Sequence, residues 1–570
     1  MSRRVTVLLA AFVLAALLPP ARGAWRNGVE TLADSGITIE ATSPFDNTPP
    51  SGCLPVWVTI RNASGSARVW TITTDTGASY GRGTNRRDTS DTVRVENGQA
   101  ARVPILVPLD TQPSGFYYRN LTLRVDGYGT GEGTVSLPEV NARAKGSPTP
   151  CIGMGEDLAT PIWASLSKWY ADKGHDLTGS PVDLDLLDGD WRALSGFDVL
   201  WLSDASYARL DAARRTAVRD WVSHGGLLCL CAQTADASVR GAVGLPPEGN
   251  ATDVGLGRVR LIVWDGKELA AETVAAEDNQ PRVNRADATA ESAEDWTMTK
   301  AVGTIPVNAL FLIGFIVVFA VLVGPVNLFV FARSARRHRL FWTTPLISVV
   351  ASLLLGMFIL FKDGFGGSGQ RALLCVILPD QKKTVVVQEQ VALTGVVLSR
   401  GFEVGEDTLL APVQIKEGAT RVYRQEGRRF FGDWFSSRSV QAHRMDAVVP
   451  SRAEITLANA DAARGGAPPV FTSSVPATIR RIAYFDPAGR RWVGDALRTG
   501  ERITLREGEV EAGAFSPGGS SDLDVVAGLL LDRRGGFVAL ADDGPFLETL
   551  PSIRWTTQRA VFAGDVTGAR

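Results

Sequence analysis

The chain has 570 residues, too many for one hydrophobic core, so about three or four domains of the usual ~150 residues are expected. Its 59 basic and 61 acidic residues nearly cancel, which argues against a nucleic-acid-binding surface. Five cysteines and four histidines, poorly spaced for a disulfide framework or for zinc, predict neither a metal site nor a cofactor.

The first apolar run predicts an export signal. A basic start precedes an uncharged stretch from Val5 to Leu18, and Ala21 and Gly23 provide the small residues that a signal peptidase reads. The stretch has 14 residues, fewer than the ~20 that a membrane-spanning helix needs. We therefore predict a cleavable signal peptide over 1–23, with an uncleaved N-terminal anchor as the alternative.

Residues 24–146 are predicted to form short strands. Two runs of β-branched and aromatic residues, 56–61 and 69–72, flank a turn cluster at 62–65, and apolar and polar residues alternate over 121–125. This pattern favours an immunoglobulin-like β-sandwich, a type of module that binds partners or spaces other domains.

Residues 147–270 change character, and a linker over 271–306 follows them. A helix with one apolar face is expected over 210–221, closed by the glycine pair 225–226. Strands with short loops to such a helix predict a parallel, doubly wound sheet. The expected strands are Val182–Leu187, Val199–Leu202 and Leu227–Ala232.

The sequences GFDVLWLSDAS (196–206) and RDWVSHGGLLCLCA (219–232) resemble the core of class I glutamine amidotransferase-like domains, which have a flavodoxin-like fold. In that family a strand ends in a tight elbow that carries a nucleophilic cysteine, and a later His-x-Glu completes the triad. Cys231 falls near the place of the nucleophile.

This chain departs from the family pattern at the triad. No glycine flanks Cys231, although the strained elbow needs small residues, and no histidine occurs between Gln233 and Pro306. His224 precedes the strand and would lie roughly 20 Å away at ~3.3 Å per residue. A thiol without a nearby base is a weak nucleophile at neutral pH, so no catalytic residue is predicted.

Core packing is the expected role of Cys229 and Cys231, which point to one strand face. The alternative is a divergent thiol hydrolase that uses Cys231, for which His443 is the only downstream extracytoplasmic base. Whether Cys53 and Cys151 form a disulfide stays open.

Two uncharged runs, 307–332 and 340–361, are each long enough to cross the ~30 Å hydrocarbon core of a membrane as a helix. The loop between them, 333–339, contains four arginines, which predicts a cytoplasmic position by the positive-inside rule. The chain is therefore expected to be an integral protein of the cytoplasmic membrane with two spans. Both large parts, 24–306 and 362–570, are expected on the extracytoplasmic side.

The first of these runs contains Pro325 and Asn327. We expect Asn327 to hydrogen-bond the neighbouring helix, because polar side chains often join membrane helices. A functional kink at Pro325 or a partner-docking site is the alternative. Neither run contains Asp, Glu, Lys or Arg, so an ion or proton relay is not expected.

The block VGPVNLFVFARSARRHRLFWTTPLISVV, at 323–350, also resembles part of a known group. It is similar to uncharacterised multidomain bacterial membrane proteins that join an amidotransferase-like module to such a hairpin and a β-rich tail. Some of these relatives are associated with ABC-type export systems. The resemblance thus implies an ABC-type transporter as one candidate partner.

Residues 362–570 are predicted to be β-rich. The runs 482–485 and 491–493 flank a turn at 486–489 and predict a hairpin. Arginines and aromatic residues interleave over 421–444, which suits contact with lipid headgroups or an acidic partner, or else a solvated, partly packed loop. The residues of this basic-aromatic patch are Arg428, Arg429, Trp434 and Arg438.

A second candidate surface is the carboxyl edge of the predicted parallel sheet, where ligands of open α/β sheets bind. The strand ends there are followed by the short polar stretches 203–206 and 233–236. We predict that they bind a ligand or partner, with plain solvated loops as the alternative. The candidate residues are Ser203, Asp204, Ser206, Gln233 and Asp236.

The predicted fold class is therefore multidomain. It combines an all-β immunoglobulin-like sandwich, an α/β flavodoxin-like parallel sheet, a two-helix transmembrane hairpin and a β-rich extracytoplasmic domain. We expect a non-enzymatic, membrane-tethered scaffold or sensor that binds a protein partner or ligand. An accessory subunit of an ABC-type exporter and a thiol hydrolase remain the alternatives.

Overall fold

A computed structural model describes most of the chain, and the predicted signal peptide lies outside the described residues. The described ranges are 25–26, 30–32, 36–75, 86–109, 122–127, 132–137, 149–266, 269–279, 293–303, 309–332, 334–415, 421–511 and 513–568.

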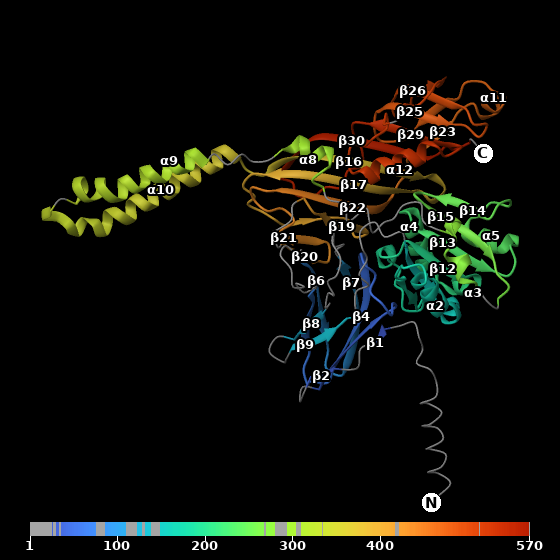
Figure 1. The fold of residues 1–570 in the computed structure, drawn as a ribbon, viewed down its shortest axis with the longest axis horizontal. Helices are drawn as coiled ribbons and strands as arrows, with labels where there is room; N and C mark the ends of the chain where they lie inside the picture. The colour runs from blue at the N-terminus through green and yellow to red at the C-terminus, as the bar shows by residue number, and fades with distance from the viewer. Residues whose placement is uncertain are drawn as a thin grey trace, which may run out of the picture.

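Figure 1 shows a body built mainly of β-sheets and, projecting from it, one arm of two helices. We call residues 309–363 the hairpin arm and the other described residues the body. Several sheets, one of them largely parallel, make up the body. The prediction of a multidomain, β-rich chain with two long apolar helices is confirmed.

The N-terminal part of the body contains two antiparallel sheets with a shared core. The turn at 62–65 carries the chain from one sheet to the other, and Trp70 is buried between them. One sheet contains β1 (Trp25–Arg26), β2 (Glu30–Leu32), β3 (Ile37–Ser43), β4 (Gly52–Asn62) and β7 (Gln99–Leu109). The other contains β5 (Arg68–Asp75), β6 (Arg86–Val95), β8 (Thr122–Asp126) and β9 (Glu132–Ser136).

The second of these sheets continues with strands from beyond the hairpin arm. Strand β20 (Val422–Glu426) runs parallel to β6, and β21 (Arg429–Gly432) and β18 (Phe402–Glu403) follow it. Arg87, buried in β6, donates from Nη2 to the carbonyl oxygen of Leu410 at 2.6 Å. Segments on either side of the arm in the sequence therefore complete one sheet.

The central part of the body is an α/β unit. Its parallel strands follow the order β11-β10-β12-β13-β15, and β14 joins the edge antiparallel. The expected strands over 199–202 and 227–232 are confirmed. The strands are β10 (Cys151–Gly155), β11 (Thr178–Val182), β12 (Val199–Ser203), β13 (Leu227–Ala232), β14 (Ala251–Val254) and β15 (Gly257–Val263).

The strand expected over Val182–Leu187 is wrong, because β11 ends where that stretch begins. After Val182 the chain forms a turn, and the amide of Asp183 donates to the carbonyl oxygen of Pro44. Leu184 and Leu187 are buried there in the core shared with the N-terminal strands. The alternation of apolar residues thus reflects contact with that neighbouring part of the body.

Helices cover both faces of the parallel sheet. Cys229 and Cys231 point to the face under α2 and α6, whereas Leu228 and Leu230 point to the face under α4. Helix α4 begins at the cap residue Asp211, whose carboxylate accepts from the amide of Arg214. The helices are α2 (Glu156–Ala171), η1 (Trp191–Leu194), α3 (Asp204–Arg209), α4 (Ala212–Ser223), α5 (Ala237–Val243), α6 (Ala271–Val274) and η2 (Glu277–Asn279).

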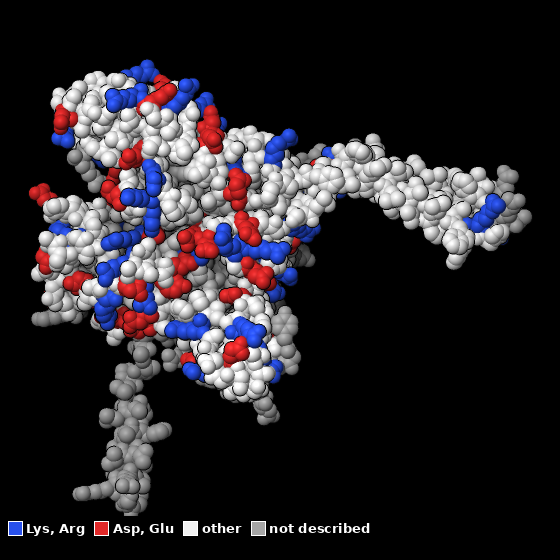
Figure 2. Space-filling view, turned by 180° about the vertical axis from the view of Figure 1, so that it is seen from behind, with Lys and Arg blue, Asp and Glu red and all other residues white. Residues whose placement is uncertain are grey.

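The hairpin arm contains two helices, Ala309–Phe331 and Arg337–Asp363, that are long and apolar enough to cross a membrane. Figure 2 shows that charged side chains cover the body with both signs interspersed, whereas the arm is almost free of them until its tip. The arm is made of α9 (Ala309–Val321), the π-helical turn η3 (Leu322–Phe331), η4 (Ser334–Arg339) and α10 (Leu340–Asp363).

Asn327 joins the two helices of the arm. Its amide donates to Thr344 Oγ1 at 2.9 Å, and Thr343 Oγ1 donates to Asn327 Oδ1 at 2.6 Å. The prediction that Asn327 hydrogen-bonds the neighbouring helix is confirmed. Pro325 lacks an amide hydrogen, and the helix widens to π geometry around it, where the amide of Ala332 donates to Asn327 O.

The C-terminal part of the body is built on a sheet of nine strands, with a small three-stranded sheet on one face and α8 and α12 on the other. The hairpin predicted around 486–489 is confirmed as the antiparallel pair β25 and β26. The central strands are β16 (Gly367–Leu378), β17 (Lys383–Thr394), β22 (Val440–Pro450), β29 (Gly536–Ala541) and β30 (Ile553–Asp565). The other elements are α8 (Thr297–Val302), η5 (Pro379–Gln381), β19 (Thr408–Val413), β23 (Ile455–Leu457), α11 (Ala460–Arg464), β24 (Val470–Ser473), β25 (Ile479–Phe485), β26 (Arg491–Leu497), β27 (Arg502–Thr504), β28 (Arg506–Glu507) and α12 (Ser521–Leu531).

Candidate functional site

The carboxyl edge of the parallel sheet brings together the ends of β10, β12 and β13. Ser203, the last residue of β12, donates from its hydroxyl to Asp157, and Ser206 Oγ donates to the same carboxylate at 2.9 Å. Ser203 Oγ also accepts from the amide of Ser206 and so caps α3. Both serines are buried. Their hydroxyls are therefore engaged within the protein and held by Asp157, which sequence reasoning had not selected.

The other three predicted residues lie nearer the surface. Asp204 is half-buried, and its Oδ1 accepts from the amide of Ala205 at 2.8 Å. Gln233 is exposed directly after β13. Asp236 caps α5 by accepting from the amides of Ser238 and Val239, and these bonds lower the pKa of its carboxyl. Asp204 and Gln233 are thus the predicted residues best placed to contact another molecule.

Further carboxylates gather at this edge. Burial raises the pKa of Glu156, at the start of α2, and the charges of Asp183, Asp46 and Asp185 add to the effect. Asp46 lies between β3 and β4 and Asp183 follows β11, so only folding brings these groups together. Each of these acidic residues lies shortly after the end of a strand, but the sequence does not show that these strand ends are adjacent in space. Carboxylates therefore predominate at this edge, where Arg209 is also present.

Cys231 is buried at this edge. Burial, together with the charges of Asp157 and Asp204, raises the pKa of its thiol to about 12. Because the nucleophile is the thiolate, a thiol with this pKa is almost fully protonated at neutral pH. The neighbouring Cys229 also has a raised pKa, from burial and from Cys231. The arrangement disfavours nucleophilic chemistry at Cys231.

Neither candidate base lies at Cys231. His224 follows α4 at the opposite end of β13, where its ring stacks on Trp191 at 4.0 Å between centroids. His443 is buried in β22 of the C-terminal sheet, where its Nε2 lies 2.9 Å from the carbonyl oxygen of Trp434. Burial lowers the pKa of His443 to about 3.

The remaining cysteines lie inside the protein. Cys53, Cys151 and Cys375 are buried thiols that are not joined in disulfides. Burial raises the pKa of Cys53. In the part of the chain that the structure describes, no group of three or more His, Cys, Asp or Glu residues could hold a metal ion.

The four residues of the basic-aromatic patch have different environments. Trp434 is buried among aromatic rings, and its indole donates to the carbonyl oxygen of Arg424 at 3.1 Å. Arg428 and Arg429 are exposed beside the turn between β20 and β21. Arg438 lies 2.8 Å, from Nε to Oδ2, from Asp363, the last residue of α10. The four residues therefore do not form one surface: Trp434 belongs to the core, Arg428 and Arg429 are at the surface, and Arg438 lies where the hairpin arm meets the body.

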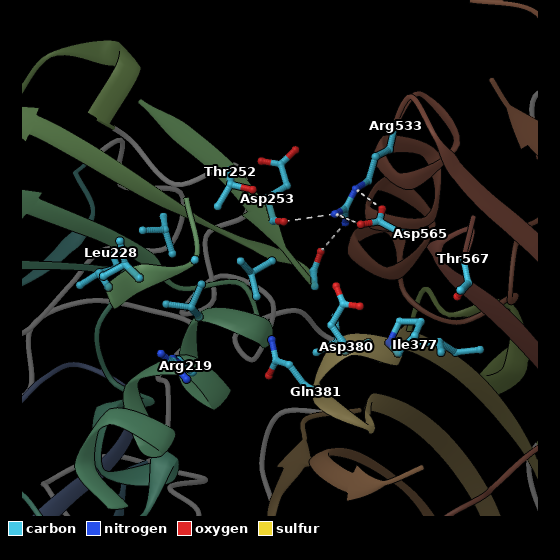
Figure 3. A pocket seen from close by; sticks show the side chains of 18 of the residues that line it. Arg219, Leu228, Thr252, Asp253, Ile377, Asp380, Gln381, Arg533, Asp565 and Thr567 are labelled. Carbon is cyan, nitrogen blue, oxygen red and sulfur yellow. Dashed lines mark hydrogen bonds and ion pairs between the residues drawn. The ribbon is translucent and has the colours of Figure 1, made fainter. Parts of the chain in front are cut away.

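A cleft of about 470 Å³ lies between the α/β unit and the C-terminal sheet. Figure 3 shows its two walls, with Arg219 and Asp253 on one side and Asp380, Gln381 and Arg533 on the other. The first wall comes from α4 and β14, and the second from the turn between β16 and β17 and the residues after α12. Because these segments are far apart in the chain, sequence patterns could not reveal the cleft.

Arg533 bridges the two walls of the cleft. Its Nη2 donates to the carbonyl oxygen of Asp253 at 3.1 Å, and its Nε lies 3.0 Å from Oδ1 of Asp565 (Figure 3). A second contact joins α4 to β17, where Lys383 Nζ lies 2.7 and 2.8 Å from the two carboxylate oxygens of Asp220. These contacts join the α/β unit to the C-terminal sheet, and the open part of the cleft offers mixed polar and apolar surface.

Comparisons with known proteins identify no family. No protein-family profile matches the chain, and no curated protein sequence matches it. A Paenibacillus cycloisomaltooligosaccharide glucanotransferase is 11% identical with a TM-score of 0.14, over 34% of this chain and 38% of the enzyme. A β-glucuronidase from glycoside hydrolase family 2 is 11% identical with a TM-score of 0.19, over 42% of this chain and 27% of the enzyme.

A third solved structure, an exo-chitosanase from Amycolatopsis orientalis, is 13% identical with a TM-score of 0.15, over 39% of this chain and 24% of the enzyme. The chain thus spans well under half the length of each of these three enzymes. Likenesses this weak carry no argument about the fold or the activity of the chain.

Proposed function

We propose that the chain is a membrane-anchored, extracytoplasmic scaffold or sensor that binds a protein partner or ligand without catalysis. The observation that carries this proposal is the pairing of β20 with β6, which joins segments on either side of the hairpin arm into one body. In the described part of the chain no residue of α9 or α10 is buried, and a bilayer is the environment that suits two such apolar helices.

The shared sheet also supports the two-span topology. Parts of the chain that pair in one sheet must lie on the same side of a membrane, so the helices between them must cross an even number of times. The arginine-rich loop at 333–339 favours a cytoplasmic tip for the arm. The body would then lie on the extracytoplasmic side.

The strand orders support the finer fold assignments. The order β11-β10-β12-β13-β15 places the second strand in the sequence at the edge, beside the first, as in flavodoxin-like sheets. This agrees with an amidotransferase-like domain that lacks its triad. The two packed antiparallel sheets of the N-terminal part agree with an immunoglobulin-like sandwich.

Two surfaces of the body are the candidate binding sites. One is the acidic carboxyl edge, where Asp204 and Gln233 are accessible. The other is the cleft bridged by Arg533, which has the concave shape and mixed lining typical of ligand sites. The raised pKa of Cys231 supports binding in preference to thiol catalysis at the first surface.

The topology is tested with a reporter that is active only in the cytoplasm. Fused at Ser334, in the tip of the arm, the reporter should be active. Fused after Gly366 or at the C-terminus, it should be silent. Activity at the C-terminus would contradict an extracytoplasmic body and with it the proposed function.

Partner binding is tested by recovering proteins with the full-length chain from native membranes. The variant Asp204→Asn with Asp236→Asn removes two charges, and asparagine preserves the cap of α5 because it caps helices as well as aspartate does. A control variant, Asp461→Asn, removes one charge from α11, which contributes no residue to the lining of the cleft or to the carboxyl edge. Equal recovery with the variant and the control would exclude the carboxyl edge as the binding surface.

A further inference from the structure

The hairpin arm meets the body at a short junction. Helix α10 ends at Asp363, and Gly364 and Gly366 turn the chain into β16 with φ angles of 69° and 76°. Glycine adopts such left-handed angles without steric cost. The chain therefore passes from the apolar helix into the large sheet within a few residues.

The loop after β17, residues 395–400, packs directly against this junction. The amide of Val396 donates to the carbonyl oxygen of Gly364 at 2.9 Å. A side chain on Gly395 would lie only 2.3 Å from the carbonyl oxygen of Asp363, so the two backbones touch there. The loop is thus held at the end of α10 by backbone contacts.

Arg438, from a third segment, contacts both the end of α10 and the 395–400 loop. Its amide donates to the carbonyl oxygen of Gly395 at 2.9 Å, and its Nε lies 2.8 Å from the carboxylate of Asp363. The carboxylate of Asp363 is almost completely buried by these contacts. Three separate segments therefore meet in one well-packed surface around the exit of the helix.

This surface carries unusually exposed apolar side chains. Phe365 is 63% exposed and Leu398 is 82% exposed. Among the described residues of the body, these are the two most exposed large apolar side chains, and both lie at the junction. Leu398 lies at most ~10 Å from Gly395, since three residues span no more than ~3.5 Å each. Such an exposed apolar patch marks a contact with another phase or molecule.

The length of α10 indicates which phase this is. Phe341 and Phe361 are exposed on the helix and 20 residues apart, which is ~30 Å at ~1.5 Å per residue, the thickness of the hydrocarbon core. If they mark its two boundaries, Phe365 lies in the headgroup layer, which adds ~5–7 Å on each side. Exposed Arg400 beside Leu398 provides a cation for headgroup phosphates.

We propose that Phe365, Leu398 and Arg400, here called the junction surface, insert into the headgroup layer of the outer leaflet. The body then docks on the membrane in one orientation instead of hanging freely from the arm. This proposal rests on the proposed function, because it requires the arm to span the bilayer. It also determines which way the carboxyl edge and the cleft face.

The proposal is tested with the full-length chain reconstituted into protein-free vesicles of phosphatidylcholine and phosphatidylglycerol. All five native cysteines are buried, so a Leu398→Cys variant accepts an environment-sensitive fluorophore selectively. Val263→Cys is the matched control, since Val263 is 60% exposed at the end of β15, in the α/β unit. Quenching is measured with lipids labelled near the headgroup and with aqueous iodide.

In vesicles, the label at 398 should emit at a shorter wavelength than it does on the unfolded chain in detergent-free buffer. It should also be quenched by the labelled lipid and shielded from iodide. The label at 263 should be quenched by iodide and not by the labelled lipid. Adding Phe365→Ser should reduce lipid quenching at 398, because the two side chains insert together. Equal iodide quenching at 398 and 263 would overturn the proposal, as would shielding of 398 in native membranes alone, which would assign the surface to a protein partner.

Extraction with alkaline carbonate separates the two proposals. If the chain is extracted from the vesicles, the arm does not span them and the proposed function fails. If the chain resists extraction while the label at 398 stays in water, only the docking of the junction surface fails.

Discussion

The ion pair between Lys383 and Asp220 offers a direct test of how the body is assembled. Asp220 lies in α4, before the hairpin arm, and Lys383 begins β17, after it. The Lys383 side chain is 27% exposed and that of Asp220 is 13% exposed. Breaking a fully buried pair costs about 3–5 kcal/mol and a surface pair contributes at most about 1 kcal/mol, so Lys383→Met should cost about 2 kcal/mol.

The loss should come mainly from leaving the carboxylate of Asp220 without its cation. Burial already raises the pKa of Asp220, and Lys383 opposes that rise. In Lys383→Met the pKa of the Asp220 carboxyl in the folded chain should rise further. Stability is then lost as the pH rises through this folded-state pKa. The destabilisation should therefore be greatest at neutral pH and should shrink on acidification, as Asp220 takes up a proton.

The assay is the urea midpoint of the full-length chain in detergent micelles, followed by tryptophan fluorescence. Lys382→Met is the matched control, because Lys382 is exposed and should change stability by less than about 0.5 kcal/mol. The double variant with Asp220→Asn should lose less than the sum of the two single losses. If Lys383→Met and Lys382→Met unfold at the same midpoint, the pair does not join the two parts of the body.

Three further outcomes are expected. Asn327→Leu should weaken the hairpin arm by about 1 kcal/mol in a mixed-micelle unfolding titration, since it removes hydrogen bonds worth about 0.6 kcal/mol each. Cys231 should be alkylated far more slowly in the folded chain than in urea, and fast labelling at neutral pH would favour the thiol hydrolase. The Cys231→Ala substitution should lower the free energy of unfolding by about 1–2 kcal/mol. Because His443 binds its proton near pH 3 when folded and near 6.5 when unfolded, stability should fall as pH drops between these values, and His443→Gln should flatten that fall in urea midpoints.

Local signals in the sequence predicted local structure well. The strand Leu227–Ala232 and the hairpin around 486–489 follow from runs of apolar residues and from turn residues, which act over a few positions. The error over Val182–Leu187 has the same origin. Leu184 and Leu187 alternate as in a strand, but they are buried by packing against a distant segment.

The candidate site was harder to predict than the fold. Ser203 ends β12 and Gln233 follows β13, and these two strands are adjacent and parallel, so both residues lie at the same edge of the sheet. The sequence did not show that Ser203 is held by Asp157 or that Asp236 caps a helix. Polar residues look alike in a sequence whether they cap, pack or bind, and only their partners distinguish these roles.

The sequence by itself determined the two helices of the hairpin arm. More than 20 consecutive apolar residues can satisfy their backbone only as a helix in an apolar environment, so composition is sufficient there. Tertiary structure alone decided that β20 pairs with β6, that Trp434 is buried, and that Leu398 is exposed beside the end of α10. The physical reason is that backbone groups offer the same hydrogen bonds to any strand, so the choice of a distant partner depends on how all the side chains pack together.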